Sequence, residues 1–155
     1  MNAKVLSTFL EAAVEVLTTE IGGPIERGQV SMLEASCPSN DVNVLLNVVG
    51  RLQGVVVYEM STQTALKFVS RMIGQEMLEL DDLAQSGIAE LGNVITGRAG
   101  TLLGATDYAV SLSVPTLVIG RATISTLDFR RIVVPLTTKD GVLEVHLALR
   151  EAPAA

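Results

Sequence analysis

Residues 81–104 read DDLAQSGIAELGNVITGRAGTLLG, and this stretch decides how the rest of the chain is organised. At about 100° per residue along a helix, its apolar and polar side chains fall on opposite sides. The apolar stripe, which we expect to be buried, consists of Ala84, Ile88, Leu91, Ile95, Ala99 and Leu102. The opposite side carries Ser86, Glu90, Asn93 and Gly97. The stretch therefore predicts a long amphipathic helix that begins near Asp81 and ends at Gly104.

Two further helices are predicted on the N-terminal side of this stretch. Apolar residues recur every three or four positions in the first twenty residues, up to Gly22-Gly23-Pro24, and another helix runs from Ser61 to Gly74. Apolar and β-branched runs predict strands in a group over 25–59 and then at about 108–119, 128–138 and 142–149. The order of helix, strands, two helices and strands is that of an α+β fold with antiparallel strands. We expect one domain over residues 1–155.

The composition excludes several classes of function. With 48% hydrophobic residues, the chain can bury enough apolar surface to fold. A net charge of −6 and 3% aromatic residues leave little to neutralise phosphates or to stack on bases, so we expect no nucleic-acid partner. No apolar run reaches the roughly 18 residues that span a bilayer, which predicts no membrane insertion. One cysteine, Cys37, and an N-terminus without a secretion signal favour a cytoplasmic location.

Glu90 and Asn93 are neighbours on the polar side of the predicted long helix, because they stand three residues apart. One interpretation is a solvated helix face, where such residues are ordinary. The other is chemical: a carboxylate can pair with a partner's ammonium group, and a carboxamide can hold a water in line for attack. Glycines inside a helix cost about 1 kcal/mol each relative to alanine. Gly92, Gly97 and Gly100 therefore indicate that something approaches this helix closely.

Two single residues give weaker signals. His146 stands between Val145 and Leu147 in a predicted strand, without cysteine or histidine partners at metal-ligand spacing. We interpret it as a structural or surface residue. Cys37 has no histidine near it in the sequence to activate it, so a nucleophilic role is not expected.

Three short patterns also have simpler interpretations than a site. Asp81 and Asp82 point to different sides of a helix, and compensation of the helix dipole explains them without a metal. The run from Gly92 to Gly97 resembles a phosphate loop only superficially, because it lacks the Lys-Ser/Thr pair and lies inside a helix. Arg130-Arg131 is expected to flank a strand, with contact to an acidic partner surface as the less favoured alternative.

The segment from Ser86 to Gly97 resembles the signature of the CheC/CheX/FliY chemotaxis phosphatases, in which Asp or Ser, Glu, Asn and Gly follow at spacings x3, x2 and x3. The later segment 113–120, with Pro115-Thr116 and Gly120, is similar to a strand of that family. The opening helix and the final strand pair also fall where the family has them. The resemblance covers nearly the whole chain, and it implies an antiparallel sheet with helices packed on one face.

The resemblance implies hydrolysis of the phosphoaspartate on a CheY-like response regulator, in chemotaxis or related two-component signalling. In that family the Glu, here Glu90, pairs with a lysine of the regulator, and the Asn, here Asn93, orients the hydrolytic water. The acyl phosphate and Mg²⁺ belong to the regulator, so no cofactor or metal is expected on this chain. Ser86 and Gly97 complete the motif without an assigned chemical role.

The first predicted helix carries Ser7, Glu11 and Val14 at the same spacing, with valine in place of asparagine. A valine cannot hold a water by hydrogen bonds. CheC-type members carry two copies of the motif and CheX-type members one, so this chain resembles the CheX type, with a lost copy on its first helix. That likeness also implies a homodimer. A non-catalytic binding module, which docks a receiver domain or a flagellar-switch protein, is the alternative.

Overall fold

The computed structural model describes residues 1–126 and 129–153. The helices are α1 (Ala3–Glu20), α2 (Thr62–Ile73) and α3 (Asp82–Gly104). The strands are β1 (Glu26–Arg27), β2 (Ser31–Leu33), β3 (Ser36–Pro38), β4 (Val42–Gly50), β5 (Leu52–Met60), β6 (Val110–Leu112), β7 (Thr116–Ile119), β8 (Thr123–Ser125), β9 (Arg131–Thr138) and β10 (Gly141–Glu151). All three predicted helices are confirmed. For α2, the Ser61 hydroxyl accepts the N–H of Thr64, and Gly74 ends the helix at a φ of 80°.

The main sheet has eight strands in the part of the chain that the structure describes, and every pairing in it is antiparallel. Its order is β1-β9-β10-β5-β4-β6, with β2 also paired to β9 and β7 also paired to β4. β3 and β8 form a separate two-stranded ribbon. Since helices and strands occur in the predicted order, the α+β fold with an antiparallel sheet is confirmed.

The strand predicted at 108–119 is two strands, β6 and β7, which pair with opposite ends of β4. The break falls at Pro115, which has no N–H to donate to a ladder. Just before it, Ser113 anchors the connection, because its backbone N–H donates to the carbonyl of Asn47 at 3.0 Å. The strand predicted at 128–138 begins outside the described residues, and β9 starts at Arg131.

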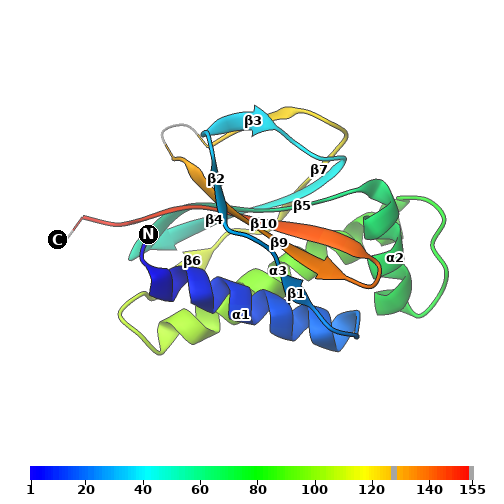
Figure 1. Cartoon of the computed structure of the whole chain (residues 1–155), viewed down its shortest axis with the longest axis horizontal. Coiled ribbons are helices and arrows are strands. Elements are labelled where there is room, and N and C mark those ends of the chain that lie inside the picture. Colours follow the sequence, from blue (N-terminus) through cyan, green and yellow to red (C-terminus); the bar gives the residue numbers. More distant parts are fainter. Residues whose placement is uncertain (127–128, 154–155) are drawn as a thin grey trace.

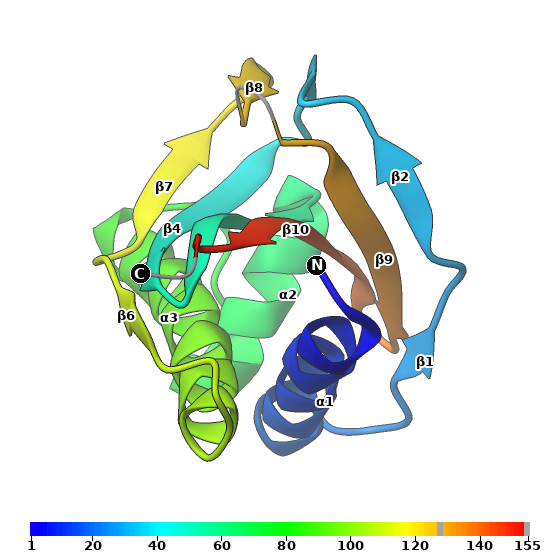
Figure 2. The same ribbon diagram turned by 90° about the vertical axis from the view of Figure 1, so that its left-hand side faces the viewer.

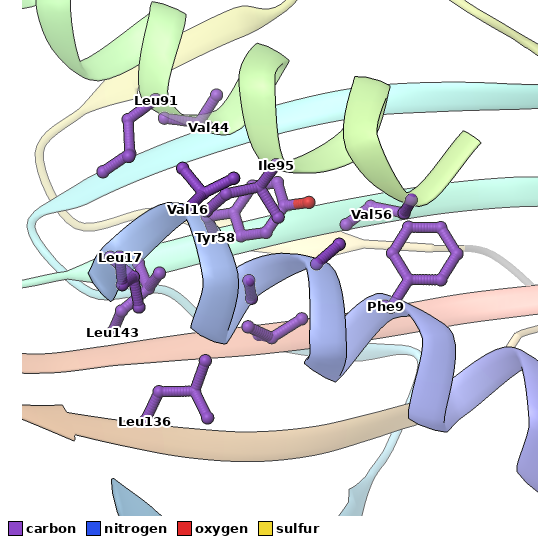
Figure 3. Close-up of a cluster of buried hydrophobic side chains, with 14 of the residues drawn as sticks. Phe9, Val16, Leu17, Val44, Val56, Tyr58, Leu91, Ile95, Leu136 and Leu143 are labelled. Carbon is purple, nitrogen blue, oxygen red and sulfur yellow. The ribbon is translucent and has the colours of Figure 1, made fainter. Parts of the chain in front are cut away.

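The three helices cover one face of the sheet (Figures 1 and 2). α1 and α3 lie side by side there and contribute Phe9 and Ile95 to the core (Figure 3). Side chains alternate between the two faces of a strand, so every second residue of β5, such as Val56 and Tyr58, points toward these helices. No helix in the described ranges combines the length and apolar character needed to cross a membrane.

The buried side of α3 follows the predicted stripe, with one difference in its last turn. The stripe residues that are buried are Ala84, Ile88, Leu91, Ile95 and Ala99. Leu102 is only partly buried, and its neighbour Leu103 is fully buried instead. The glycines predicted that something approaches α3 closely. At Gly92 the sheet makes this approach, because a Cβ added to Gly92 would lie 2.7 Å from Val44 Cγ1. Gly92 therefore lets α3 pack directly on β4.

Candidate functional site

The four motif residues Ser86, Glu90, Asn93 and Gly97 lie on α3, on the side away from the buried stripe. Ser86 and Glu90 are exposed, whereas Asn93 and Gly97 are partly buried. The start of this helix is fixed by Asp81, whose Oδ1 accepts the N–H of Ala84 at 2.9 Å. Asp81 is therefore the helix cap, a role beyond the dipole compensation expected from its sequence position, and the helix turn alone brings Glu90 and Asn93 together.

The side chains of Glu90 and Asn93 form no hydrogen bond or ion pair with any residue that the structure describes. Their neighbours are engaged. Arg98 Nε donates to Glu15 Oε2 of α1 at 3.1 Å, and the Thr101 hydroxyl donates to the carbonyl of Gly97 at 3.1 Å. A free carboxylate accepts hydrogen bonds, and a free carboxamide both accepts and donates. Glu90 and Asn93 are therefore available to an external molecule.

The site is a helix surface rather than a pocket. A groove of about 750 Å³ lies along α2, with Lys67, Arg71 and Leu78 among its lining residues, and none of the four motif residues contributes to it. Small-molecule sites are usually concave and mostly apolar, whereas Glu90 is an exposed, charged side chain on a helix. A pair of side chains without partners on the outer side of a helix suits contact with another protein.

The matching pattern on α1 lacks the carboxamide. Ser7 and Glu11 are exposed on this helix, while Val14 is partly buried and packs against the core. The valine side chain is thus part of the packing of α1 against the core, and it offers no polar atom. Of α1, α2 and α3, the helices in the described ranges, α3 alone presents a glutamate and an asparagine at the motif spacing.

His146 lies on the opposite face of the sheet and is buried in a polar cluster that we define as Glu59, Arg131, Glu144 and His146. Its Nε2 lies 3.1 Å from Glu144 Oε1, and its Nδ1 lies 3.4 Å from Glu59 Oε2. The hydrogen bond from His146 holds the pKa of Glu144 below its usual range, against the opposing effect of burial. His146 is therefore structural, as the sequence indicated.

Glu59, Glu144 and His146 bring three metal-ligating side chains together, but Arg131 takes the place of a cation among them. Arg131 Nη1 lies 3.5 Å from Glu59 Oε2 and 3.5 Å from His146 Nδ1. A guanidinium at this position compensates the buried carboxylate and would repel a metal ion. The geometry favours an ion-paired cluster over a metal site.

The two adjacent arginines differ in a way that the sequence did not show. Arg130 is exposed and pairs with Glu34 at 3.6 Å. Arg131 is fully buried and its Nη2 donates to the carbonyls of Ile124 and Ala35, which fastens the β3–β8 ribbon to the sheet. Contact of Arg131 with an acidic partner surface, the less favoured alternative, is therefore wrong.

Cys37 lies on β3 and is partly buried. Burial raises the pKa of its thiol, while the nearby charge of Arg131 acts in the opposite direction. A nucleophilic cysteine needs a lowered pKa, because the thiolate is the reactive form. The environment of Cys37 therefore agrees with the expectation that it is not a nucleophile.

Solved structures define the class of fold. A CheC-like superfamily protein from Shewanella sp. PV-4 superposes with a TM-score of 0.86 at 23% identity, covering 97% of this chain and 99% of that one. The CheX–CheY–BeF3–Mg²⁺ complex from Borrelia burgdorferi contains a match with a TM-score of 0.83 at 27% identity, covering 95% of this chain and 98% of that one. The fold is that of the CheC-like superfamily.

Sequence comparison gives the family. The family model described as chemotaxis phosphatase CheX matches residues 42–137, a range that includes all of α3. The CheY-P phosphatase CheX of Thermotoga maritima is 30% identical over 122 residues, which is 78% of this chain and 79% of that protein. The chain belongs to the chemotaxis phosphatase CheX family.

Proposed function

We propose that this chain is a protein-phosphoaspartate phosphatase that dephosphorylates a CheY-like response regulator. The observation that carries the proposal is the pair of free side chains, Glu90 and Asn93, on the exposed side of α3. The name of the Thermotoga maritima relative, CheY-P phosphatase, and the complex of a Borrelia burgdorferi relative with CheY support the class of partner. Catalysis then consists of positioning groups in a partner's active site.

In this mechanism Glu90 pairs with the ammonium group of a regulator lysine, and this ion pair sets the register of the two proteins. Asn93 enters the regulator's active site, where its carboxamide hydrogen-bonds the attacking water. The water oxygen forms a bond to phosphorus as the bond between phosphorus and the aspartate oxygen breaks. The products are inorganic phosphate and the free aspartate, and the water's protons go to phosphate and solvent. Mg²⁺ expected on the regulator would neutralise charge on the phosphoryl group.

The direct test measures phosphate release from a phosphorylated CheY-like regulator after its phosphodonor has been removed, with and without this protein. We expect the first-order rate of release to rise with the concentration of the protein and to saturate. If a complex forms but release is never faster, the chain is instead a binding module that docks a receiver domain or a flagellar-switch protein. A panel of regulators from the same organism identifies the cognate substrate.

Exchanging Glu90 for glutamine should weaken docking more than it slows the chemical step. Glutamine keeps the size of the side chain and removes the charge that pairs with the lysine, so we expect KM to rise about tenfold, equivalent to roughly 1.4 kcal/mol. The turnover number at saturation should change less. Steady-state dephosphorylation over a range of regulator concentrations separates the two parameters.

Glu11→Gln is the matched control, because Glu11 is an exposed glutamate at the same motif position on α1, where the carboxamide is missing. We expect wild-type KM for this variant. Equal losses in the Glu90 and Glu11 variants would point to general electrostatic attraction and contradict a specific ion pair at Glu90.

We also propose that the protein is a homodimer that pairs through β2. This strand pairs with β9 on one side and with no described strand on the other, and all three of its residues are exposed. Val30 beside it is 48% exposed and Met32 within it is 52% exposed. An exposed apolar strand at a sheet edge is a template for pairing with a second chain.

A lysine at position 32 should therefore shift the protein toward monomer, since charge on an edge strand opposes edge-to-edge pairing. Sedimentation equilibrium measures the dimer dissociation constant, which we expect to rise about tenfold or more for Met32→Lys. Val142→Lys, an exposed position on β10 inside the sheet, is the control. A wild-type protein that stays monomeric at high micromolar concentration would show that this assembly is wrong.

A further inference from the structure

The glycines of α3 differ in what surrounds the position where a side chain would begin. An added Cβ at Gly92 would lie 2.7 Å from Val44 Cγ1, and one at Gly87 would lie 3.3 Å from Val69 Cγ2. Packing against β4 and α2 explains these two. A Cβ at Gly97 would meet no atom within 4 Å, and its φ is not in the positive range that favours glycine. Nothing in the described residues of this chain requires a glycine at position 97.

Glycine at this position is also unfavourable for the helix. Gly97 lies inside α3, with another seven residues before the helix ends at Gly104. Glycine disfavours a helix interior more than any residue except proline. Because no packing reason within the described residues accounts for Gly97, a contact made from outside the chain is the explanation that we pursue.

The place of Gly97 identifies that contact. It stands four residues after Asn93, one helical turn further on the same side. Asparagine is short, so its carboxamide reaches a partner's phosphoryl group only if partner atoms come close to the backbone of α3. A side chain on the adjacent turn would hold the partner away from the helix and withdraw the carboxamide from the water.

The side chains beside Gly97 on α3 project little over it. Val94 and Thr101, which are exposed near it, have short side chains. The one long side chain beside it, Arg98, is drawn toward α1 by its hydrogen bond to Glu15 Oε2 at 3.1 Å. The helix surface on the C-terminal side of Asn93 is therefore kept clear by two independent features, a glycine and an arginine that is held aside.

We propose that the missing side chain at Gly97 leaves room for the rim of the receiver domain's active site to pack directly on α3, so that Asn93 reaches the phosphoaspartate. We call this room the steric clearance at Gly97. This rests on the proposed function. In this arrangement the receiver surface beside the phosphorylated aspartate contacts α3 on the C-terminal side of Asn93. Gly97 then determines how closely the substrate protein can approach.

Larger side chains at position 97 should lower affinity in proportion to their size without harming the fold. For a receiver domain loaded with beryllofluoride and Mg²⁺, we expect binding to weaken about tenfold in Gly97→Ala and about a hundredfold in Gly97→Leu, the usual range for overpacking an interface by these volumes. The melting temperature should equal or exceed that of the wild type, because alanine and leucine are better helix formers than glycine. Phosphate release at low regulator concentration should fall in parallel.

Gly100→Ala is the matched control. An added Cβ there would lie 3.7 Å from Leu112 Cδ1, an ordinary contact, so this variant removes a helix glycine one turn away without overpacking. We expect wild-type binding for it. It also shows whether a stiffer helix by itself alters the activity.

The outcomes separate this inference from the proposed function. The wild type accelerating phosphate release while both Gly97 variants bind the loaded receiver as tightly as the wild type would refute the role of Gly97. The proposed phosphatase function would then be kept. A lowered melting temperature in Gly97→Ala would assign the glycine to the fold and also contradict the inference. If the wild type neither binds nor dephosphorylates any regulator, the proposed function is wrong, and so is the role of Gly97 that depends on it.

Discussion

Replacing Asn93 with alanine is expected to reduce the acceleration of phosphate release about a hundredfold or more, while the complex with the regulator still forms. The expected size is that of removing one preorganised hydrogen-bonding group from a transition state. Alanine cannot hold the water, but it leaves the ion pair of Glu90 and the clearance at Gly97 in place. Single-turnover dephosphorylation at saturating protein measures the chemical step, and binding of a beryllofluoride-loaded receiver measures the complex.

Two further expected results would show that the loss of rate comes from the missing carboxamide. Alanine is the best helix former, and Asn93 has no partner among the described residues, so the melting temperature of Asn93→Ala should not fall. Asn93→Asp keeps the shape but loses the N–H donors and adds a charge beside the phosphoryl group, so it should be inactive as well. Full acceleration by either variant would refute the mechanism.

Glu90, Asn93 and Gly97 on α3 should therefore differ in kinetic signature. A group that acts only in the transition state lowers kcat and kcat/KM equally, whereas a group that binds the ground state and the transition state alike changes KM. Asn93 belongs to the first kind, and Glu90 and Gly97 belong to the second. A scan of α3 in which all three positions changed KM alone would mean that docking controls the rate.

Much of the helical structure, and the placement of Glu90 and Asn93 as neighbours, could be predicted from sequence because both depend on local geometry, whereas the choice of these two residues as a candidate site came from the resemblance to the family. Caps such as Ser61, Gly74 and Asp81 act within one turn of the chain. The site residues share a single helix, where spacing alone decides that Glu90 and Asn93 are neighbours. No long-range pairing was needed to place them.

The strands were harder because pairing joins residues that are far apart in the chain. The β3–β8 ribbon brings Cys37 opposite Ile124, a contact that no local pattern predicts. Arg131 shows the same limit. Beside Arg130 it has the sequence of an exposed basic pair, and only the alternation of β9 turns it inward, toward His146 on the neighbouring β10 and Glu59 on β5 beyond it.

Replacing Arg131 with methionine is expected to lower the free energy of unfolding by about 3–5 kcal/mol, the usual cost of breaking a buried ion pair from one side. Glu59 would keep its hydrogen bond from the backbone N–H of Asn40 at 2.8 Å, but its carboxylate, 3% exposed, would lose its guanidinium. The ribbon would also lose the bonds from Arg131 to the carbonyls of Ala35 and Ile124. Urea unfolding measures the loss as a lower midpoint.

The double variant Arg131→Met, Glu59→Leu distinguishes charge from packing. With both charges removed, an apolar pair of similar volume should recover the part of the loss that comes from the unpaired Glu59 carboxylate, because buried ion pairs are often replaced by hydrophobic residues at little net cost. The bonds from Arg131 to the carbonyls of Ala35 and Ile124 stay lost in this variant. Arg130→Met is the control: it removes an exposed pair with Glu34 and should cost no more than about 0.5 kcal/mol. Folded Arg131→Met should keep its phosphatase activity, because the cluster lies across the sheet from α3. If the two single arginine variants were equally stable, the polar cluster would not hold the ribbon to the sheet.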